Sequence, residues 1–287
     1  MPLRPLALIA LAWLAAMPAT AAESYDNCTG FIDALPAVVS AQGTWCLRKD
    51  LSTAMASGTA ISIQANNVTL DCNGFKLGGL AAGLDTGANG IGWTNRSNIT
   101  VRNCSIRGFE YGLDVNGGND AHHAIENNRF DGNTHVGLHI SGDNHRIVGN
   151  QVNDTGGSPG WAGSFGISVN GDHVLVQGNS ITGVWVSDTA NNGNGLVRGI
   201  SALTGRGNVF QDNRISALVP RGTGSAVALD VSHSLVQGNV VLNAAGGTTA
   251  IEGAYGDAPP SLCIGNRFSG YATTMVDCIS GGGNVSF

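Results

Sequence analysis

An acid, an imidazole and a hydroxyl occupy corresponding positions of three successive short segments: Asp114 in GLDV, His139 in GLHI and Ser168 in GISV. These residue types carry out general acid–base and nucleophilic chemistry. If the apolar residue before each one points inward, the three side chains point outward together, about 4.8 Å apart on stacked strands. A nucleophilic triad is disfavoured, because parallel neighbours project side by side and no oxyanion hole is evident.

Two interpretations of these residues remain open. One is a polar, solvent-exposed sheet face with no site. The other is a carbohydrate platform, in which side chains that can bond sugar hydroxyls lie above a row of glycines. The platform side chains would be Asp114, Asn116, His139, Ser141, Ser168 and Asn170, and the glycines would be Gly112, Gly137, Gly166 and Gly199. On an enzymatic interpretation the candidate catalytic residues are Asp114, His139 and Arg198.

The two longest predicted loops, residues 153–164 and 182–197, lie beside the same polar positions. Loops on a rigid scaffold commonly carry function. Trp161 and Trp185 would either stack on sugar rings or pack the loops down. Asp188 is a further candidate for substrate binding. Arg198, which follows the second loop, would act as an acid or a substrate clamp, or else form a surface salt bridge.

Two other groups of polar residues are expected to be structural. His122 and His123 resemble an acid–base pair, but His123 aligns with apolar scaffold positions of other segments. Asp71, Arg102 and Glu126 align on successive segments as a cross-strand charge ladder.

The elements that position these side chains form a repeat. The stretch LVQGN occurs at residues 175–179 and again at 235–239, within a series of similar segments. Aligned on this stretch, seven of eight positions in one column are asparagine: Asn73, Cys104, Asn128, Asn150, Asn179, Asn213, Asn239 and Asn266. Apolar residues fill the columns three before and two after it. Intervals of 22 to 34 residues suit stacked coils with variable loops.

A second family of short segments with period-2 alternation lies between these repeats. Its predicted outward column contains Ser62, Gly92, Asp114, His139, Ser168, Ser201, Ala228 and Glu252. Each coil therefore supplies at least two short strands, which stacking would pair in register. The chain has 43 glycines, 42% hydrophobic and 12% charged residues, which indicates a turn-rich β protein rather than a disordered one. We expect an all-β, right-handed parallel β-helix of about eight coils, a solenoid over residues 58–287.

The asparagine-containing coils resemble those of the pectate-lyase-like superfamily of exported β-helix proteins. That superfamily includes lyases, hydrolases, epimerases, esterases and non-catalytic surface proteins, so the resemblance implies the fold more strongly than an activity. The Asp-Asp pair and Gly-His-Gly of polygalacturonase-like hydrolases are absent from the sequence. YGLDVNGG (111–118) resembles only the start of the Tyr-Gly-x-Asp-Pro-His-Asp motif of alginate epimerases. Calcium is expected as a cofactor only if the substrate is a uronate polymer, and no metal site is predicted.

The ends of the chain give further expectations. Residues 23–57 would form an N-terminal cap with a short helix, because Phe31, Leu35, Val38 and Val39 lie close to helical spacing. The expected disulfides are Cys28–Cys46 beside this helix, Cys72–Cys104 between adjacent coils, and Cys263–Cys278 near the end of the chain.

Residues 1–22 resemble a cleavable secretory signal, with Arg4, an apolar run and small residues at the end. An even cysteine count fits export to an oxidising compartment. A net charge of −6 argues against a nucleic-acid partner. We expect a secreted or periplasmic monomer without a transmembrane segment, which binds or processes a polysaccharide or cell-envelope glycan as a lyase-like or related carbohydrate-active protein. The alternative is a non-catalytic structural or glycan-binding module of the cell surface.

Overall fold

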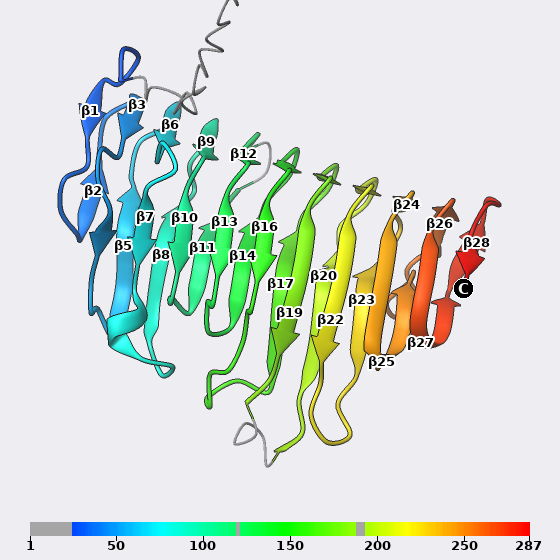
Figure 1. Cartoon of the computed structure of the whole chain (residues 1–287). Coiled ribbons are helices and arrows are strands. Elements are labelled where there is room, and N and C mark those ends of the chain that lie inside the picture. Colours follow the sequence, from blue (N-terminus) through cyan, green and yellow to red (C-terminus); the bar gives the residue numbers. More distant parts are fainter. Residues whose placement is uncertain (1–24, 119–120, 188–192) are drawn as a thin grey trace, which may run out of the picture.

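The computed structural model describes residues 25–118, 121–187 and 193–287. The described chain winds into a solenoid of about nine turns, in which every coil lies directly on the previous one (Figure 1). All the ladders between its named strands are parallel, as a solenoid of this kind requires. The predicted signal at residues 1–22 lies outside the described residues.

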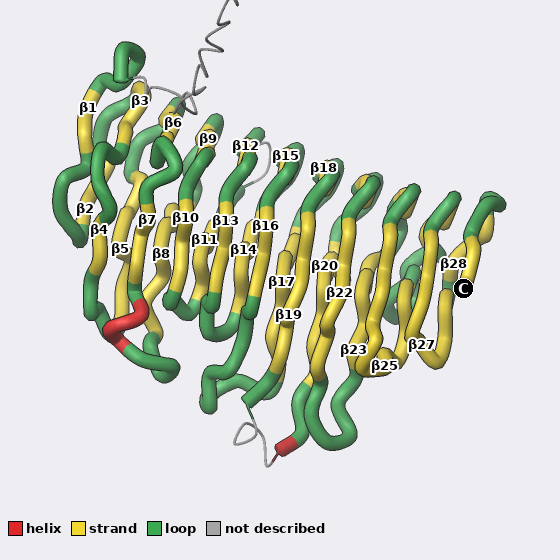
Figure 2. The backbone as a smooth tube through the Cα atoms, in the orientation of Figure 1, coloured by secondary structure: helices red, strands yellow, loops and turns green. Residues whose placement is uncertain are grey.

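The strands form three faces, which are continuous ribbons along the length of the solenoid (Figure 2). Face 1 contains β1 (Gly30–Phe31), β3 (Gly43–Cys46), β6 (Val68–Asp71), β9 (Ile99–Arg102), β12 (Ala124–Glu126), β15 (Arg146–Val148), β18 (Leu175–Gln177), β21 (Val209–Gln211), β24 (Leu235–Gln237), β26 (Ser261–Ile264) and β28 (Cys278–Ser280). Face 2 contains β4 (Leu51–Ser52), β7 (Lys76–Gly78), β10 (Ser105–Arg107), β13 (Arg129–Asp131), β16 (Gln151–Asn153), β19 (Ser180–Trp185), β22 (Arg214–Val219) and β29 (Val285–Ser286).

Face 3 positions the candidate site. It contains β2 (Ala37–Val39), β5 (Ser57–Ile63), β8 (Gly87–Thr94), β11 (Tyr111–Asn116), β14 (Val136–Ser141), β17 (Gly163–Asn170), β20 (Leu196–Thr204) and β23 (Ala226–Val231). β25 (Val240–Glu252) and β27 (Arg267–Val276) continue from face 2 into face 3, so the two faces count as one sheet. Alternate residues of each strand point into the apolar interior, where Leu113, Leu138 and Ile167 are fully buried.

An asparagine ladder joins successive coils between faces 1 and 2. Asn150 Nδ2 donates to Asn179 Oδ1 at 3.0 Å, and the same oxygen accepts the Asn150 backbone N–H at 2.9 Å. The pattern repeats without interruption along Asn128, Asn150, Asn179, Asn213, Asn239, Asn266 and Asn284. In both copies of LVQGN the glycine before the asparagine has a positive φ, +64° at Gly178 and +67° at Gly238, which favours glycine. The repeated stretch is therefore a structural unit.

Asn73 departs from the predicted ladder. Its backbone has a positive φ of 49°, and its Nδ2 donates to Leu47 O rather than to an asparagine. In the next coil Cys104 replaces asparagine and donates its backbone N–H to Asn128 Oδ1 at 3.0 Å, so the ladder begins at Asn128.

The predicted capping helix is wrong. Phe31 lies in β1, Val38 and Val39 lie in β2, and the described residues contain no α-helix; the named helix η1 (Leu80–Ala82) is a short 3-10 helix far from the cap sequence. Val39 is buried and pairs with Ile63, whereas Val38 is 54% exposed, so the two valines alternate as in a strand. Pro36 disfavours the α conformation at Leu35 and cannot donate a helical hydrogen bond. The cap is an additional small β coil.

Three disulfides, Cys28–Cys46, Cys72–Cys104 and Cys263–Cys278, fasten the two ends, with the pairing expected from the sequence. Cys72 and Cys104 have Cα atoms 4.7 Å apart on adjacent coils. No helix among the described residues is long and apolar enough to cross a membrane.

Candidate functional site

The outward column of face 3 brings Asp114, His139 and Ser168 together. Asp114 pairs with His139 between β11 and β14, and His139 pairs with Ser168 between β14 and β17. The full column in the structure is Ser62, Gly92, Asp114, His139, Ser168, Ser201, Asp230 and Glu252. The sequence prediction therefore placed the three chemically capable residues correctly as neighbours on consecutive coils.

The placement of Ala228 in this column is wrong. Leu229 pairs with Ile200 and Asp230 with Ser201, so Asp230 occupies the outward position. In the segment AVALDV, a small residue followed by an apolar one occurs twice, at Ala226–Val227 and at Ala228–Leu229. Because the two alignments differ by two residues, both keep the same alternation of inward and outward side chains. The larger Leu229 fills the interior, where it is fully buried.

His139 lies between two hydroxyl groups. Its Nδ1 is 3.2 Å from Ser168 Oγ and its Nε2 is 3.2 Å from Ser141 Oγ. In the neutral imidazole one nitrogen donates and the other accepts, and either hydroxyl can satisfy either role. These two contacts fix the plane of the ring on a rigid strand.

Burial favours the uncharged forms of both His139 and Asp114. Burial lowers the pKa of His139, and the charge of Asp114 partly opposes that shift. Burial also raises the pKa of Asp114, against the opposing effects of His139, Asn116 and Asn89. The Asp114 carboxylate accepts hydrogen bonds from Asn89 Nδ2 at 3.0 Å and Asn116 Nδ2 at 3.3 Å. A neutral imidazole in this position is able to accept a proton.

An aromatic cluster, comprising Tyr111, His135, Trp161 and Phe165, borders the column. Trp161 stacks on His135 with ring centroids 4.1 Å apart. Tyr111 packs edge-on against both His135 and His139, at 5.2 and 6.1 Å between centroids. Trp161 Nε1 donates to Glu110 Oε1 at 2.8 Å, which ties the loop of residues 153–164 to the residue directly before β11. One indole face is therefore held in place, and 43% of Trp161 remains exposed.

Sequence reasoning missed Glu110, Tyr111 and His135 as members of the site. Burial raises the pKa of Tyr111 to about 12, with smaller contributions from the charges of Glu110 and Asp114, so its phenol keeps its proton at neutral pH. Burial lowers the pKa of His135 to about 4. Tyr111 lies three residues before Asp114, and extension of the coil alignment by that distance would have identified it.

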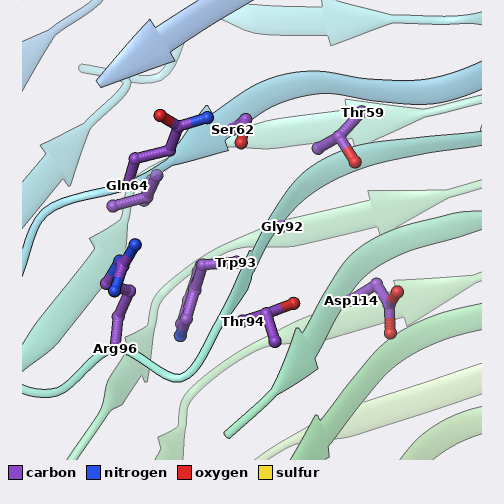
Figure 3. A pocket seen from close by; sticks show the side chains of 9 residues that line it. Thr59, Ser62, Gln64, Gly92, Trp93, Thr94, Arg96 and Asp114 are labelled. Atoms are coloured by element: carbon purple, nitrogen blue, oxygen red, sulfur yellow. The ribbon is translucent and has the colours of Figure 1, made fainter. Parts of the chain in front are cut away.

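A polar cavity of about 310 Å³ lies at the N-terminal end of the column (Figure 3). Gly92 has no side chain, which leaves space between Ser62 and Asp114 in the coils on either side. Arg96 and Asp114 also line this cavity, together with Trp93. The strip from this cavity to Ser168 is called the column groove below.

The other residues of the predicted platform lie in a parallel row or face inward. Asn116, Ser141 and Asn170 pair on successive strands, two residues beyond the outward column. The glycine row lies on the inner side of the face. A Cβ at Gly112 would lie 2.5 Å from the Gly137 carbonyl oxygen, and the same close approach recurs at Gly137 and Gly166. These glycines allow close stacking of the coils and form no outer surface.

Arg198 and Trp185 do not join the column groove. The Arg198 side chain is largely buried, and its Nε donates to Asp230 Oδ2 at 2.5 Å while Nη1 donates to Ser225 Oγ at 3.0 Å. Its charge is therefore already neutralised. Trp185 packs against Gly157, where an added Cβ would lie 2.4 Å from the indole ring. Of the two roles expected for Trp185, packing of the loop is therefore the one that the structure supports. Asp188 lies outside the described residues.

His123 and the charged residues Asp71, Arg102 and Glu126 have the structural roles expected of them. His123 is buried, stacks on His145 with centroids 4.8 Å apart, and accepts a hydrogen bond from Trp93 Nε1 at 3.0 Å. Arg102 pairs with both Asp71 and Glu126 across face 1, and its Nε donates to Asp71 Oδ2 at 2.7 Å. In residues 25–118, 121–187 and 193–287 no three His, Cys, Asp or Glu side chains are placed to hold a metal ion.

Comparisons with known proteins agree with this geometry. The model of the family described as the right-handed β-helix region matches residues 89–261. The chain belongs to the right-handed β-helix family. The match includes Asp114, His139 and Ser168, so the candidate site of this right-handed β-helix protein lies on the family scaffold itself.

Two solved structures resemble the chain at low sequence identity. The Dettilon tailspike protein is similar with a TM-score of 0.50 and 15% identity, over 89% of this chain and 59% of the tailspike chain. The C387A mutant of the DFA-IIIase from Arthrobacter chlorophenolicus A6, in complex with DFA-III, has a TM-score of 0.47 and 14% identity, over 82% of this chain and 63% of its own. The chain thus spans less than two thirds of either protein. No curated protein sequence matches it.

Proposed function

We propose that this β-helix protein binds a polysaccharide along the column groove. The observation that carries the proposal is the convergence of Asp114, His139 and Ser168 with an exposed, oriented indole at Trp161. Sugar rings present hydroxyl groups at their edges and C–H groups on their faces. A row of short polar side chains beside an aromatic face matches both.

The rigidity of the groove supports binding without rearrangement. Each polar side chain is fixed to a strand that is paired on both sides, and His139 is held by Ser141 and Ser168. A preformed surface loses little conformational entropy on binding, which compensates for the modest energy of each sugar hydrogen bond. A linear polymer that lies across the coils would contact several strands at once.

Processing of the bound polymer is a second candidate function, favoured by the relation between His139 and Tyr111. His139 is held neutral by burial and Tyr111 keeps its phenol proton, with 6.1 Å between their ring centroids. One group can accept a proton from the bound sugar while the other donates one to a leaving oxygen, as a lyase-like reaction requires. Arg198 is not proposed as the base, because Asp230 and Ser225 already occupy its guanidinium.

We further propose that the protein works in an oxidising compartment, secreted or periplasmic, after removal of residues 1–22. The three disulfides support this proposal, because such bonds persist outside reducing cytosol. Mass spectrometry of the protein recovered from its native host would test it. A mature N-terminus near residue 23 with all cysteines oxidised is expected, and an intact N-terminus in a cytosolic fraction would contradict it.

A binding assay and a product assay separate the two candidate functions. Glycan-array binding of the wild type, with loss of binding in His139→Ala, is expected for either function. Ultraviolet absorbance of unsaturated sugar products is expected only for lyase-like processing, and should disappear in Tyr111→Phe. Binding without product would leave the protein as a glycan-binding module, and no binding to any glycan would support a structural role in the envelope.

A further inference from the structure

The cavity at the N-terminal end of the column groove is lined by an arginine that has no charged partner among the residues the structure describes. Arg96 lines the cavity, and no ion pair of Arg96 exists among the residues that the structure describes. Its Nη1 donates to Asn95 O at 3.2 Å. Its Nε is buried and has no hydrogen-bond partner in the described part of the chain. A buried donor left in this state costs free energy, so an acceptor supplied by a ligand would bind there favourably.

The charges of the cavity are separated. Figure 3 shows Arg96 and Gln64 on one side of the cavity, and Thr59 and Asp114 on the other, with Gly92 and Trp93 between them. Asp114 already accepts two amide hydrogen bonds, from Asn89 and Asn116. Its carboxylate is therefore engaged on its own side of the cavity, whereas the guanidinium has a partner only at Nη1 and its Nε–H has no acceptor among the described residues.

The dimensions and the lining suit one sugar residue. A volume of about 310 Å³ is at the lower end of the range for small-molecule sites. Ser62, Gln64 and Thr94 add neutral hydrogen-bonding groups around Arg96. The chain as a whole carries a net charge of −6, which repels anionic polymers in general. Arg96, which forms no ion pair within the described part of the chain, supplies the local attraction that an anionic polymer would need to bind such a chain.

We propose that this cavity is a subsite for a sugar that carries one anionic group, a carboxylate or a sulfate, which Arg96 binds. This inference rests on the proposed function, because the cavity continues into the column groove and would hold one residue of the same polymer. The Nε–H and an Nη2–H of the guanidinium form a fork that matches two oxygens of either group. Polymers with acidic sugars would thereby be selected over neutral ones.

Matched pairs of charged and uncharged glycans test the proposal by isothermal titration calorimetry. The first pair is hexagalacturonate and its methyl ester, and the second is sulfated and unsulfated dextran of equal length. The wild type should bind one charged member roughly tenfold more tightly than its uncharged partner. The pair whose two members differ in affinity identifies carboxylate or sulfate as the recognised group.

Three variants assign the preference to this arginine. Arg96→Gln should abolish the charge preference, and Arg96→Lys should keep part of it, because lysine retains the charge but lacks the fork. Arg214→Gln, an exposed arginine on face 2 that makes no ion pair among the described residues, should behave like the wild type. Circular dichroism would establish that each variant is folded.

The outcomes distinguish this inference from the proposed function. Equal binding of charged and uncharged glycans, or a preference that persists in Arg96→Gln, would overturn the subsite and leave polysaccharide binding intact. If none of the four glycans binds, the subsite is overturned, and the glycan array decides separately whether the protein binds another polysaccharide. A direct measurement adds to this: the Arg96 Nε–H resonance should shift on titration with glucuronate and not with glucose, and an unmoved resonance would overturn the subsite.

Discussion

At the scale of single residues, the candidate site depends on side chains that are held in place but can still contact a ligand. His139 is fixed by two hydroxyls, and its two nitrogens can exchange donor and acceptor roles because Ser141 and Ser168 can each donate or accept. Trp161 is fixed by Glu110 and His135 but remains 43% exposed. By contrast, Arg198 and Trp185 use their polar and apolar groups within the fold. This difference separates the candidate binding residues from the structural ones.

Trp161 and Trp185 are a matched pair for testing this distinction. We expect Trp161→Ala to weaken glycan binding about tenfold, because a sugar loses its stacking face. Trp161→Phe keeps an aromatic face and should recover part of the affinity. Trp185→Ala should lower the melting temperature and leave the glycan affinity of the folded protein unchanged. Titration calorimetry and thermal melts measure these effects, and equal loss of affinity in both alanine variants would refute the assignment.

At the scale of the elements, the stability of each bend depends on the asparagine ladder. Asn179 is buried, and its Oδ1 accepts both the backbone N–H and the Nδ2 of Asn150, while its own Nδ2 donates to Ile147 O. The same Nδ2 also donates to Asn213 Oδ1 at 3.0 Å, which continues the ladder into the next coil. Loss of one member leaves several buried groups unpaired at once.

We expect Asn179→Ala to reduce the free energy of unfolding by about 3 kcal/mol, since buried unpaired polar groups each cost about 1–3 kcal/mol. Urea denaturation followed by circular dichroism measures this loss. Gln177→Ala, at the last residue of β18 two positions earlier, is the control, because its side chain lies outside the ladder on face 1. A loss below about 0.5 kcal/mol in Asn179→Ala would show that the ladder contributes little to stability.

The periodic elements could be predicted from the sequence, and the irregular ones could not. Asparagine and valine columns recur because each coil repeats the same bend, so alignment of LVQGN located the strands and the neighbours Asp114, His139 and Ser168. The predicted capping helix was wrong because the spacing of four apolar residues fits a helix or two strands equally well. The pairing of β2 with β5, which the sequence does not reveal, selects the strands. Arg198 and Asp230 could not be paired from the sequence, because a shift of two residues in β23 keeps the same alternation.

At the scale of the whole molecule, the solenoid places titratable groups deep inside a continuous stack. His123 and His145 stack on each other in the buried interior, at the bend between faces 3 and 1 that directly precedes β12 and β15. The His123 backbone N–H donates to His145 Nδ1 at 3.1 Å, so that nitrogen must be unprotonated. Burial lowers the pKa of His123 to about 3 and that of His145 to about 4.

The fold should therefore lose stability in mild acid. The unfolded chain binds protons at its histidines near pH 6.5, whereas the folded chain resists protonation at His123 and His145 until about pH 4 or below. Their contribution is complete above pH 6.5 and is lost as the pH falls toward those values, roughly 3 kcal/mol per histidine by pH 4. Urea unfolding from pH 7 to pH 4 measures the slope.

His145→Asn is the matched variant for this prediction. Asparagine fills the same position at Asn208, where its Oδ1 accepts the Val174 backbone N–H at 2.8 Å. The variant should keep the acceptor for His123 N–H and show a shallower dependence of stability on pH. An identical slope in the wild type and His145→Asn would refute a role for this histidine in the acid sensitivity.

The central claim is that the column groove binds a polysaccharide. One glycan-array measurement tests it most directly, with the wild type compared with the double variant Asp114→Asn/His139→Ala after both are shown to be folded. Both substitutions lie on the outer side of face 3 and leave the buried interior unchanged. The wild type should bind at least one class of polysaccharide, and the double variant should lose at least about 90% of that signal. No glycan bound by the wild type, or equal binding by the double variant, would contradict the account.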